Sequence, residues 1–283
     1  GSSLTQQGIL KKSSLDRYST RFNIDHKATK WLDLGLKATV GYSKTNFADP
    51  EAGAGRQNWG NPWFTTLLAY PYESPDDWYN VDNPTLITKY YDRETGRLKT
   101  VASVYAKASI TDWLSVKTNF GLDFMYNRNV STLHRDHPNA QQNHGYYGQT
   151  SSELFRYTWT NTINVNKDFA NGHSLNAVAG MEMFQGKWYT SNFTGYDLNS
   201  DMMQSPAGIG DKSGSSLFPP SIGGGRTMSN LMSFFAQASY SIANKYNFSA
   251  SLRHDTSSKF YEDNASATFW SVGASWLISS ESW

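Results

Sequence analysis

The run Trp31-Leu-Asp-Leu-Gly-Leu-Lys-Ala-Thr-Val-Gly-Tyr-Ser43 decides the fold of this chain. Its even-numbered positions, from Leu32 to Tyr42, are all apolar, whereas its odd-numbered positions, from Asp33 to Ser43, are polar or glycine. Successive side chains of a β-strand point to opposite faces, while those of a helix return to one face every three or four residues. The run is therefore a strand with one apolar and one polar face.

The same alternation recurs along the chain and predicts nine strands. They cover residues 15–26, 31–43, 98–110, 113–127, 151–166, 173–186, 229–242, 246–254 and 268–278. Several of them exceed the five or six residues that are usual for globular strands. They reach the roughly 9–11 residues that a tilted strand needs to cross a bilayer.

The links between these strands alternate in length. Short links are expected at about 27–30, 111–112, 167–172 and 243–245, and long links at about 44–97, 127–150, 187–228 and 255–267. Short turns on one rim and long loops on the other are typical of outer-membrane barrels, whereas a Greek-key sandwich does not sort its loops in this way. The pattern predicts an all-β, antiparallel, up-and-down transmembrane β-barrel. Because bacterial single-chain barrels have an even strand number and nine is odd, the chain is expected to be part of a larger barrel.

Aromatic residues stand near both ends of the predicted strands. The short turns are followed by Trp31, Trp113 and Tyr246, and the opposite ends carry Tyr42, Tyr126 and Phe184. Two rings of aromatic side chains are expected where strands meet the two membrane interfaces. The alternative is that these residues cap an ordinary hydrophobic core.

The composition narrows the function classes. Charged residues make up 17% of the chain, below the roughly 25% of soluble domains, while aromatic residues make up 15%. The net charge of +1 provides no overall basic field for nucleic acid. The absence of cysteine excludes disulfides, thiolate zinc sites and cysteine nucleophiles.

Three stretches of the chain carry motifs of a known family. Ser229–Phe260 includes Ser233-Phe-Phe-Ala-Gln-Ala-Ser-Tyr240 and Arg253-His-Asp-Thr-Ser-Ser-Lys-Phe260. These motifs are similar to the S-Y-F-x-R-x-x-Y and R-R-D-G-S-S-R-F of SusC/RagA-type TonB-dependent transporters. Phe269-Trp-Ser-Val-Gly-Ala-Ser-Trp-Leu-Ile278 and Arg17-Tyr-Ser-Thr-Arg-Phe-Asn-Ile-Asp25 match further family patterns. His254, Thr256 and Trp270 depart from them, so the resemblance does not identify a substrate. It covers most strands and none of the long loops.

The resemblance implies a role in energised uptake across the outer membrane of a Gram-negative, Bacteroidota-like bacterium. The expected partners are TonB, a SusD-like surface lipoprotein, outer-membrane lipid and a glycan or peptide substrate; no enzyme activity and no cofactor are expected. Residues 1–283 would form part of a single barrel domain, about two-fifths of a twenty-two-stranded barrel, whose plug domain and remaining strands lie elsewhere. Several polar residues are expected to face the lumen or plug: Arg17, Arg21, Lys37, Lys117, Asp123 and Arg156.

A stretch of the first long link mixes aromatic and acidic residues. The candidate ligand-binding residues are Trp59, Trp63, Tyr72, Asp76, Asp77, Trp78 and Tyr79. Aromatic faces stack on sugar rings while carboxylates accept hydroxyl hydrogens, so the mixture suits a sugar-binding surface; the carboxylates could also form an oxygen cage for calcium. The alternative is a self-packed loop in which Trp59, Trp63 and Phe64 cover a short helix around 62–70.

Histidines cluster in the second long link, as His134-Arg-Asp-His137 with His144 beyond. Imidazole and carboxylate groups at close spacing can bind zinc, but a solvated loop is the simpler interpretation. The spacing shows neither a Ser–His–Asp arrangement nor another catalytic pattern.

Two hypotheses from other classes remain open at this point. One is a soluble carbohydrate-binding β-sandwich whose aromatic-rich loops hold the sugar. The other is a small outer-membrane barrel enzyme with a catalytic group on its rim. The first predicts two packed sheets and the second a small closed barrel, whereas part of a large barrel is a single open sheet.

Overall fold

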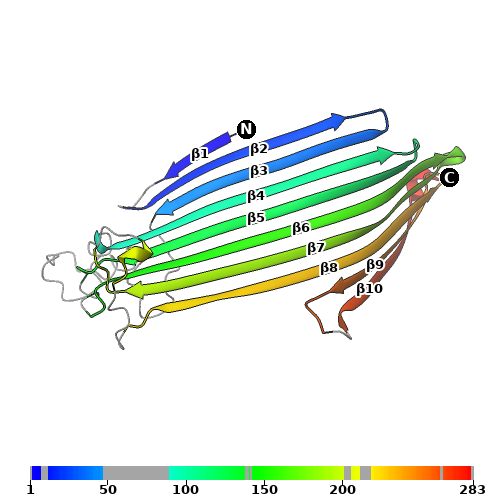
Figure 1. Ribbon diagram of the computed structural model, residues 1–283. Helices are drawn as coiled ribbons and strands as arrows, with labels where there is room; N and C mark the ends of the chain where they lie inside the picture. The colour runs from blue at the N-terminus through cyan, green and yellow to red at the C-terminus, as the bar shows by residue number, and fades with distance from the viewer. Residues whose placement is uncertain are drawn as a thin grey trace.

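The structure, a computed structural model, describes residues 2–7, 12–46, 89–137, 140, 142–200, 205–210, 218–261 and 264–281. Within them, ten strands form one antiparallel sheet whose spatial order is the order of the chain. Figure 1 shows them side by side in a single curved layer. The strands are β1 (Ser2–Gln7), β2 (Ser14–Lys27), β3 (Leu32–Asn46), β4 (Tyr91–Ser109), β5 (Leu114–Leu133), β6 (Tyr146–Phe169), β7 (His173–Tyr196), β8 (Ser221–Ile242), β9 (Tyr246–Ser257) and β10 (Ser266–Trp276). Among the described residues, no helix is long and apolar enough to cross a membrane.

All nine predicted strands are present, and β1 is a tenth that was not predicted. Its sequence, SSLTQQ, has too few apolar residues to show an alternation. The odd strand number was therefore the wrong ground for expecting a partial barrel. The partial barrel follows instead from the sheet itself, because its described strands end at β1 and β10 without pairing the two edges. One layer that never folds back on itself is also not a sandwich.

The links sort by length as predicted. The short ones, at residues 28–31, 110–113, 170–172 and 243–245, gather at one end of the sheet, and the longer ones gather at the other (Figure 1). Asn171 and Asn244 adopt left-handed backbone conformations, with φ of 59° and 57°, which asparagine tolerates better than most residues. These two ends are called the turn side and the loop side below.

Several strands continue far into the regions that were predicted to be long links. β5 runs to Leu133, β6 starts at Tyr146, β7 runs to Tyr196 and β8 starts at Ser221. Beyond the bilayer both faces of a sheet meet water, so the side chains there have no reason to alternate between apolar and polar. The backbone pairing continues nevertheless, and the loop-side ends of the strands were therefore invisible to a search for alternation.

One face of the sheet is a continuous apolar band. The register places apolar residues opposite one another from strand to strand, as in the row Leu36, Val104, Phe120, Trp159, Met183 and Met232. Val104 and Phe120 are half exposed, which a single uncovered layer permits only if lipid covers it. On β3 the band extends from Leu32 to Tyr42, about ten steps of roughly 3.3 Å, so a strand tilted by about 40° spans about 25 Å. That is the height of the apolar band on outer-membrane barrels.

The aromatic rings are present, with one correction. Trp31 and Trp113 lie in the turn-side links with exposed indole groups, and Tyr246 of β9 lies at the turn-side end of the apolar face. Tyr42 and Tyr126 lie on the apolar face toward the loop side. Phe184 does not belong to the ring, because it pairs with Thr158 and Leu231 on the opposite face. Because successive side chains of a strand alternate between the two faces, a position one residue earlier or later would have been on the face of the ring.

Four strands are joined on the polar face by Tyr105 of β4. Its ring crosses Gly35 of β3, and its hydroxyl donates a hydrogen bond of 2.8 Å to Asp25 of β2. On the other side, the ammonium group of Lys117 on β5 lies 4.9 Å from the ring centroid, a cation–π contact. A glycine is needed at position 35 because a Cβ atom there would overlap the ring of Tyr105.

The apolar band makes a prediction about charge. Ala236 lies on the band and Gln237, its neighbour on β8, lies on the polar face. In the full-length receptor folded into lipid vesicles, Ala236→Arg should lower the free energy of unfolding by about 2–4 kcal/mol, because arginine near the bilayer midplane loses its hydration. The measurement is a denaturant titration. The matched control, Gln237→Arg, should cost less than about 1 kcal/mol. Equal losses would contradict the assignment of the two faces.

The contact between Gly35 and Tyr105 makes a second prediction. Gly35→Ala should displace the Tyr105 ring, break its hydrogen bond to Asp25 and destabilise the receptor by about 1–2 kcal/mol. Gly41→Ala is the control, since the nearest atom to its new Cβ is the Tyr18 carbonyl oxygen at 3.7 Å, an ordinary contact. Thermal unfolding of both variants tests this. If the loss at position 35 persists when Tyr105 is also changed to alanine, the ring is not its cause.

Candidate functional site

The polar face of the sheet is the wall of the barrel lumen, because the opposite face is covered by lipid. The register places on it every residue that was expected to point inward. Asp123 stands between Val101 and Arg156, Lys117 opposite Lys107, and Lys37 opposite Asn23. Charge is tolerated here because water or protein groups can solvate it.

On β7 to β9 the charges on the lumen face are joined in ion pairs. The guanidinium group of Arg253 lies 2.7 Å from Asp255 and 3.6 Å from Glu182, and it donates a 3.0 Å hydrogen bond to Ser233, which is fully buried. The Thr160 hydroxyl donates a further bond of 3.2 Å to Glu182. Arg253 and Asp255 belong to the stretch that resembles the transporter family. They form a structural network whose polar atoms are already satisfied.

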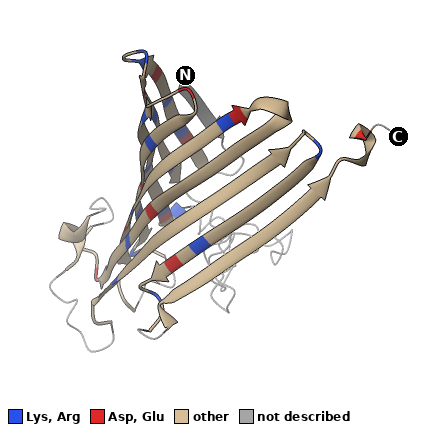
Figure 2. Cartoon of the chain, turned by 90° about the vertical axis from the view of Figure 1, so that its right-hand side faces the viewer, with Lys and Arg blue, Asp and Glu red and all other residues tan. Residues whose placement is uncertain are grey.

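The charges on β2 to β6 are distributed differently between the two halves of the wall. One row across these strands, formed by Arg21, Thr39, Val101, Asp123 and Arg156, divides the halves. The polar face on its turn side carries both signs: Lys27, Lys37, Lys107 and Lys117 with Asp25, Asp33 and Asp168. The polar face from that row to the loop side carries six cations: Arg17, Arg21, Arg93, Arg97, Lys99 and Arg156. Asp123 is the one carboxylate on this half of the face among the described strands. Figure 2 shows most of the blue bands on the N-terminal strands.

The loop-side rim is held by a cluster around Asp92 at the start of β4. Its carboxylate lies 2.8 Å from the Lys12 ammonium group and 2.7 Å from Nε2 of His134. Burial by itself raises the pKa of the Asp92 carboxyl, but the hydrogen bonds from Lys12 and His134 outweigh it and hold the pKa below its usual range. This cluster fixes the segment before β2 and the link after β5 to the same strand.

The histidine-bearing link is packed only in part: Arg135, Asp136 and His144 are exposed, as a solvated loop predicts, whereas His137 is buried and contradicts that interpretation. His137 is 3% exposed, and its ring meets Tyr90 edge-on at 6.2 Å between centroids. Burial lowers the pKa of the His137 imidazole, because desolvation disfavours the charged form. His144 pairs with Asp197 at 2.9 Å. In the part of the chain that the structure describes, no three His, Asp or Glu side chains come together as a metal site.

Two loop-side links share a small core. Tyr147 and Ala140 are fully buried, and Leu198 from the link after β7 is 1% exposed. Leu198 also pairs with Ile209 as an isolated bridge, and its N–H donates a 3.0 Å hydrogen bond to the carbonyl of His144. These contacts make the rim an ordered surface. No sequence pattern indicates it, because the core consists of single residues from two links and from the start of β6.

The predicted ligand-binding residues lie outside the described residues. Trp59, Trp63, Tyr72, Asp76, Asp77, Trp78 and Tyr79 all fall within 47–88, as does the short helix around 62–70. Sugar binding, calcium binding and a self-packed loop therefore stay predictions.

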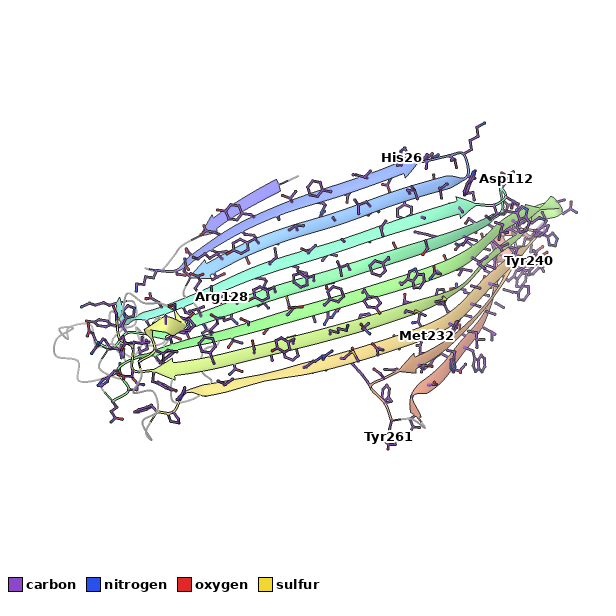
Figure 3. All side chains as sticks on the ribbon, in the orientation of Figure 1. His26, Asp112, Arg128, Met232, Tyr240 and Tyr261 are labelled. Carbon is purple, nitrogen blue, oxygen red and sulfur yellow. The ribbon has the colours of Figure 1, made fainter. Side chains whose placement is uncertain are left out.

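One lumen residue was missed because it falls where a loop was predicted. Trp188 of β7 stands opposite Leu154 and Thr227 on the polar face and is 49% exposed. Following the two-residue period of β7 past residue 186 would have placed it there. Figure 3 shows how the side chains on the extended strands continue toward the loop side, where Arg128 is labelled.

Comparison with known proteins identifies this architecture. Residues 41–282 match the family described as "TonB dependent receptor-like, beta-barrel". The chain is 22% identical over 280 residues to TonB-dependent receptor P39 of Formosa agariphila, and 25% identical over 300 residues to receptor P3 of the same organism. These alignments cover 98% and 99% of this chain but only 26% and 28% of the two receptors.

Solved structures agree on the fold. The RagAB peptide importer in its open-open state superposes with a TM-score of 0.76 at 20% identity, covering 96% of this chain and 30% of that chain. The ferric preacinetobactin receptor BauA of Acinetobacter baumannii superposes less closely, with a TM-score of 0.52 at 12% identity. The chain spans 26–30% of the two Formosa receptors and of the RagAB chain, and 39% of BauA. Its open ten-stranded sheet, with one lipid face and one lumen face, has the geometry of part of such a barrel. The chain belongs to the TonB-dependent receptor family and forms part of the barrel that this family places in the outer membrane of Gram-negative bacteria.

Proposed function

We propose that the whole protein is an active importer that takes up a glycan or a peptide across the outer membrane. The observation that carries this proposal is the division of the sheet into a lipid face and a polar lumen wall within a family of TonB-dependent receptors. A wall of hydroxyl, amide and charged side chains suits a water-filled passage for a hydrophilic solute. Energy would come from TonB, acting on a plug domain outside residues 1–283.

The proposed partner at the surface is a SusD-like lipoprotein. The likeness to the RagAB peptide importer and the similarity of Ser229–Phe260 to SusC/RagA transporters support it. The ordered rim around Asp92 and Leu198 offers a fixed surface at the loop side, where such a partner would sit. A peptide cargo is supported by the likeness to a peptide importer, and a glycan cargo by the mixture of aromatic and acidic residues in 59–79.

Deletion of the gene in its native bacterium tests the import function. The strain should lose growth on at least one polysaccharide or protein digest as sole carbon source, keep growth on glucose, and recover when the gene is returned on a plasmid. Deletion of the TonB system should give the same loss. Unchanged growth on every polymer, with unchanged uptake of labelled oligomers, would rule out an importer.

The residues of the first long link should contact the cargo. Trp78→Ala in the full-length receptor is expected to weaken binding of the identified cargo about tenfold, because stacking of an aromatic face on the cargo is lost. Isothermal titration with purified receptor measures this. The control is Phe260→Ala, which removes an exposed aromatic from the link between β9 and β10. Wild-type affinity in the Trp78 variant would leave the self-packed loop as the better interpretation.

A further inference from the structure

We propose that the loop-side half of the lumen wall binds an anionic glycan, a carbohydrate chain that carries sulfate or carboxylate groups. The binding surface is a basic patch formed by Arg17, Arg21, Arg93, Arg97, Lys99 and Arg156. This inference rests on the proposed import function and narrows its cargo to one chemical class.

Positive charge is concentrated in the basic patch. The chain as a whole has a net charge of +1, yet the patch gathers its cations in one half of one face. Asp123, the one carboxylate within this half of the described strands, has its Oδ1 atom buried without a hydrogen-bond partner among the described residues. Because six cations stand against this one carboxylate on these described strands, the surface that a solute meets is positive. A concave wall of one sign raises the local concentration of ligands of the opposite sign.

The cations of the patch are spread both along and across the strands. Arg17 and Arg97 both pair with Ser43, from opposite sides of β3, so their backbones are about 10 Å apart at about 4.8 Å per strand. Lys99 follows Arg97 on the same face of β4, about 7 Å further along the strand. Such intervals suit a chain with repeated anionic groups better than they suit one small anion.

Several of these charges are not neutralised within the wall. Among the described residues, neither Arg17, Lys99 nor Arg156 forms an ion pair, and all three are exposed. Arg97 donates to the side-chain oxygen of Asn127, at 2.9 Å, and forms no ion pair with a carboxylate in the part of the chain that the structure describes. Arg253, in contrast, is already paired with two carboxylates. Positive groups that the fold leaves available can bind an anion without first breaking a native ion pair.

The surroundings of the cations favour a glycan over an acidic peptide. The neighbours of the patch on the polar face are mostly hydroxyl and amide groups: Ser19, Thr39, Ser43, Thr95, Asn127, Asn129 and Ser152. Such groups exchange hydrogen bonds with sugar hydroxyls. Trp188 lies in the same row as Lys99, with Met125 and Leu154 between them, and offers an exposed ring for a sugar to stack on.

Binding to the purified full-length receptor in detergent tests the inference. The probes are dextran sulfate oligosaccharides, unsulfated dextran oligosaccharides of the same length, and poly-glutamate. The wild type should bind the sulfated sugar, bind unsulfated dextran at least tenfold more weakly, and lose affinity as salt screens the charges. Removing three cations in Arg17→Gln/Arg97→Gln/Lys99→Gln should weaken binding of the sulfated sugar at least tenfold.

The control variant is Lys37→Gln/Lys107→Gln, which removes lumen cations from the turn-side half. It should bind the sulfated sugar within about twofold of the wild type. Equal losses in both variants would show general charge attraction and overturn the assignment to the basic patch. Tighter binding of poly-glutamate than of the sulfated sugar would replace the glycan with an acidic peptide. A patch variant that binds like the wild type would overturn the proposal outright.

Growth of the deletion strain separates this inference from the proposed function. Loss of growth on a uronic-acid-rich or sulfated polysaccharide, with growth on neutral polysaccharides kept, supports both. Loss of growth on neutral polysaccharides or protein digests alone leaves the importer in place and overturns the anionic cargo. Loss on none of them overturns the importer, whatever the patch binds in detergent.

Discussion

The backbone hydrogen-bond ladder is the constraint on which the rest of this structure depends. Within the hydrocarbon of a membrane no water is available, so every N–H and C=O group must find its partner in the protein. The sheet meets this demand by pairing each strand with its neighbours in chain order, from β1 to β10. Short turns at one end follow from this, because an antiparallel neighbour needs only a few residues of connection. The register that the ladder fixes then decides which side chains meet lipid and which meet the lumen.

Once the register is fixed, the chemistry of the two faces separates. The lipid face carries a row such as Leu36, Val104 and Phe120, while the lumen face receives nearly all the charge of the membrane-spanning part. Gly35 is a position where the packing of the lumen face and the apolar character of the lipid face are met by neighbouring residues. It leaves room on the polar face for Tyr105 to reach Asp25, while its neighbours Leu34 and Leu36 serve the lipid face. A low average charge and a high aromatic content are the result of this division.

How far the sequence predicts this structure depends on whether a residue lies within the bilayer. There the alternation is imposed by lipid, and all nine predicted strands are present. Outside it the alternation ends, so the loop-side parts of β5 to β8 were assigned to loops and Trp188 was missed. The rim was harder still to predict, because His137 and Leu198 lie in separate links, Tyr147 lies at the start of β6, and their burial depends on how these segments come together. The inward position of Arg17, Lys117 and Arg156 was predicted correctly, but their unequal distribution between the two halves of the wall required the register.

The extension of β5 to β8 beyond the apolar band affects how such a receptor can evolve. Residues 127–133 and 146–152 are paired with one another but lie beyond the apolar band, so the thickness of the membrane does not fix the length of this segment. Adding or removing matched pairs of residues there would raise or lower the rim while every side chain nearer the turn kept its face. A single inserted residue would invert the faces beyond it, unless a bulge absorbed it. Insertions and deletions that alter the rim, and with it the cargo, can therefore accumulate in steps of two residues at the loop side. The bilayer does not constrain this part of the chain.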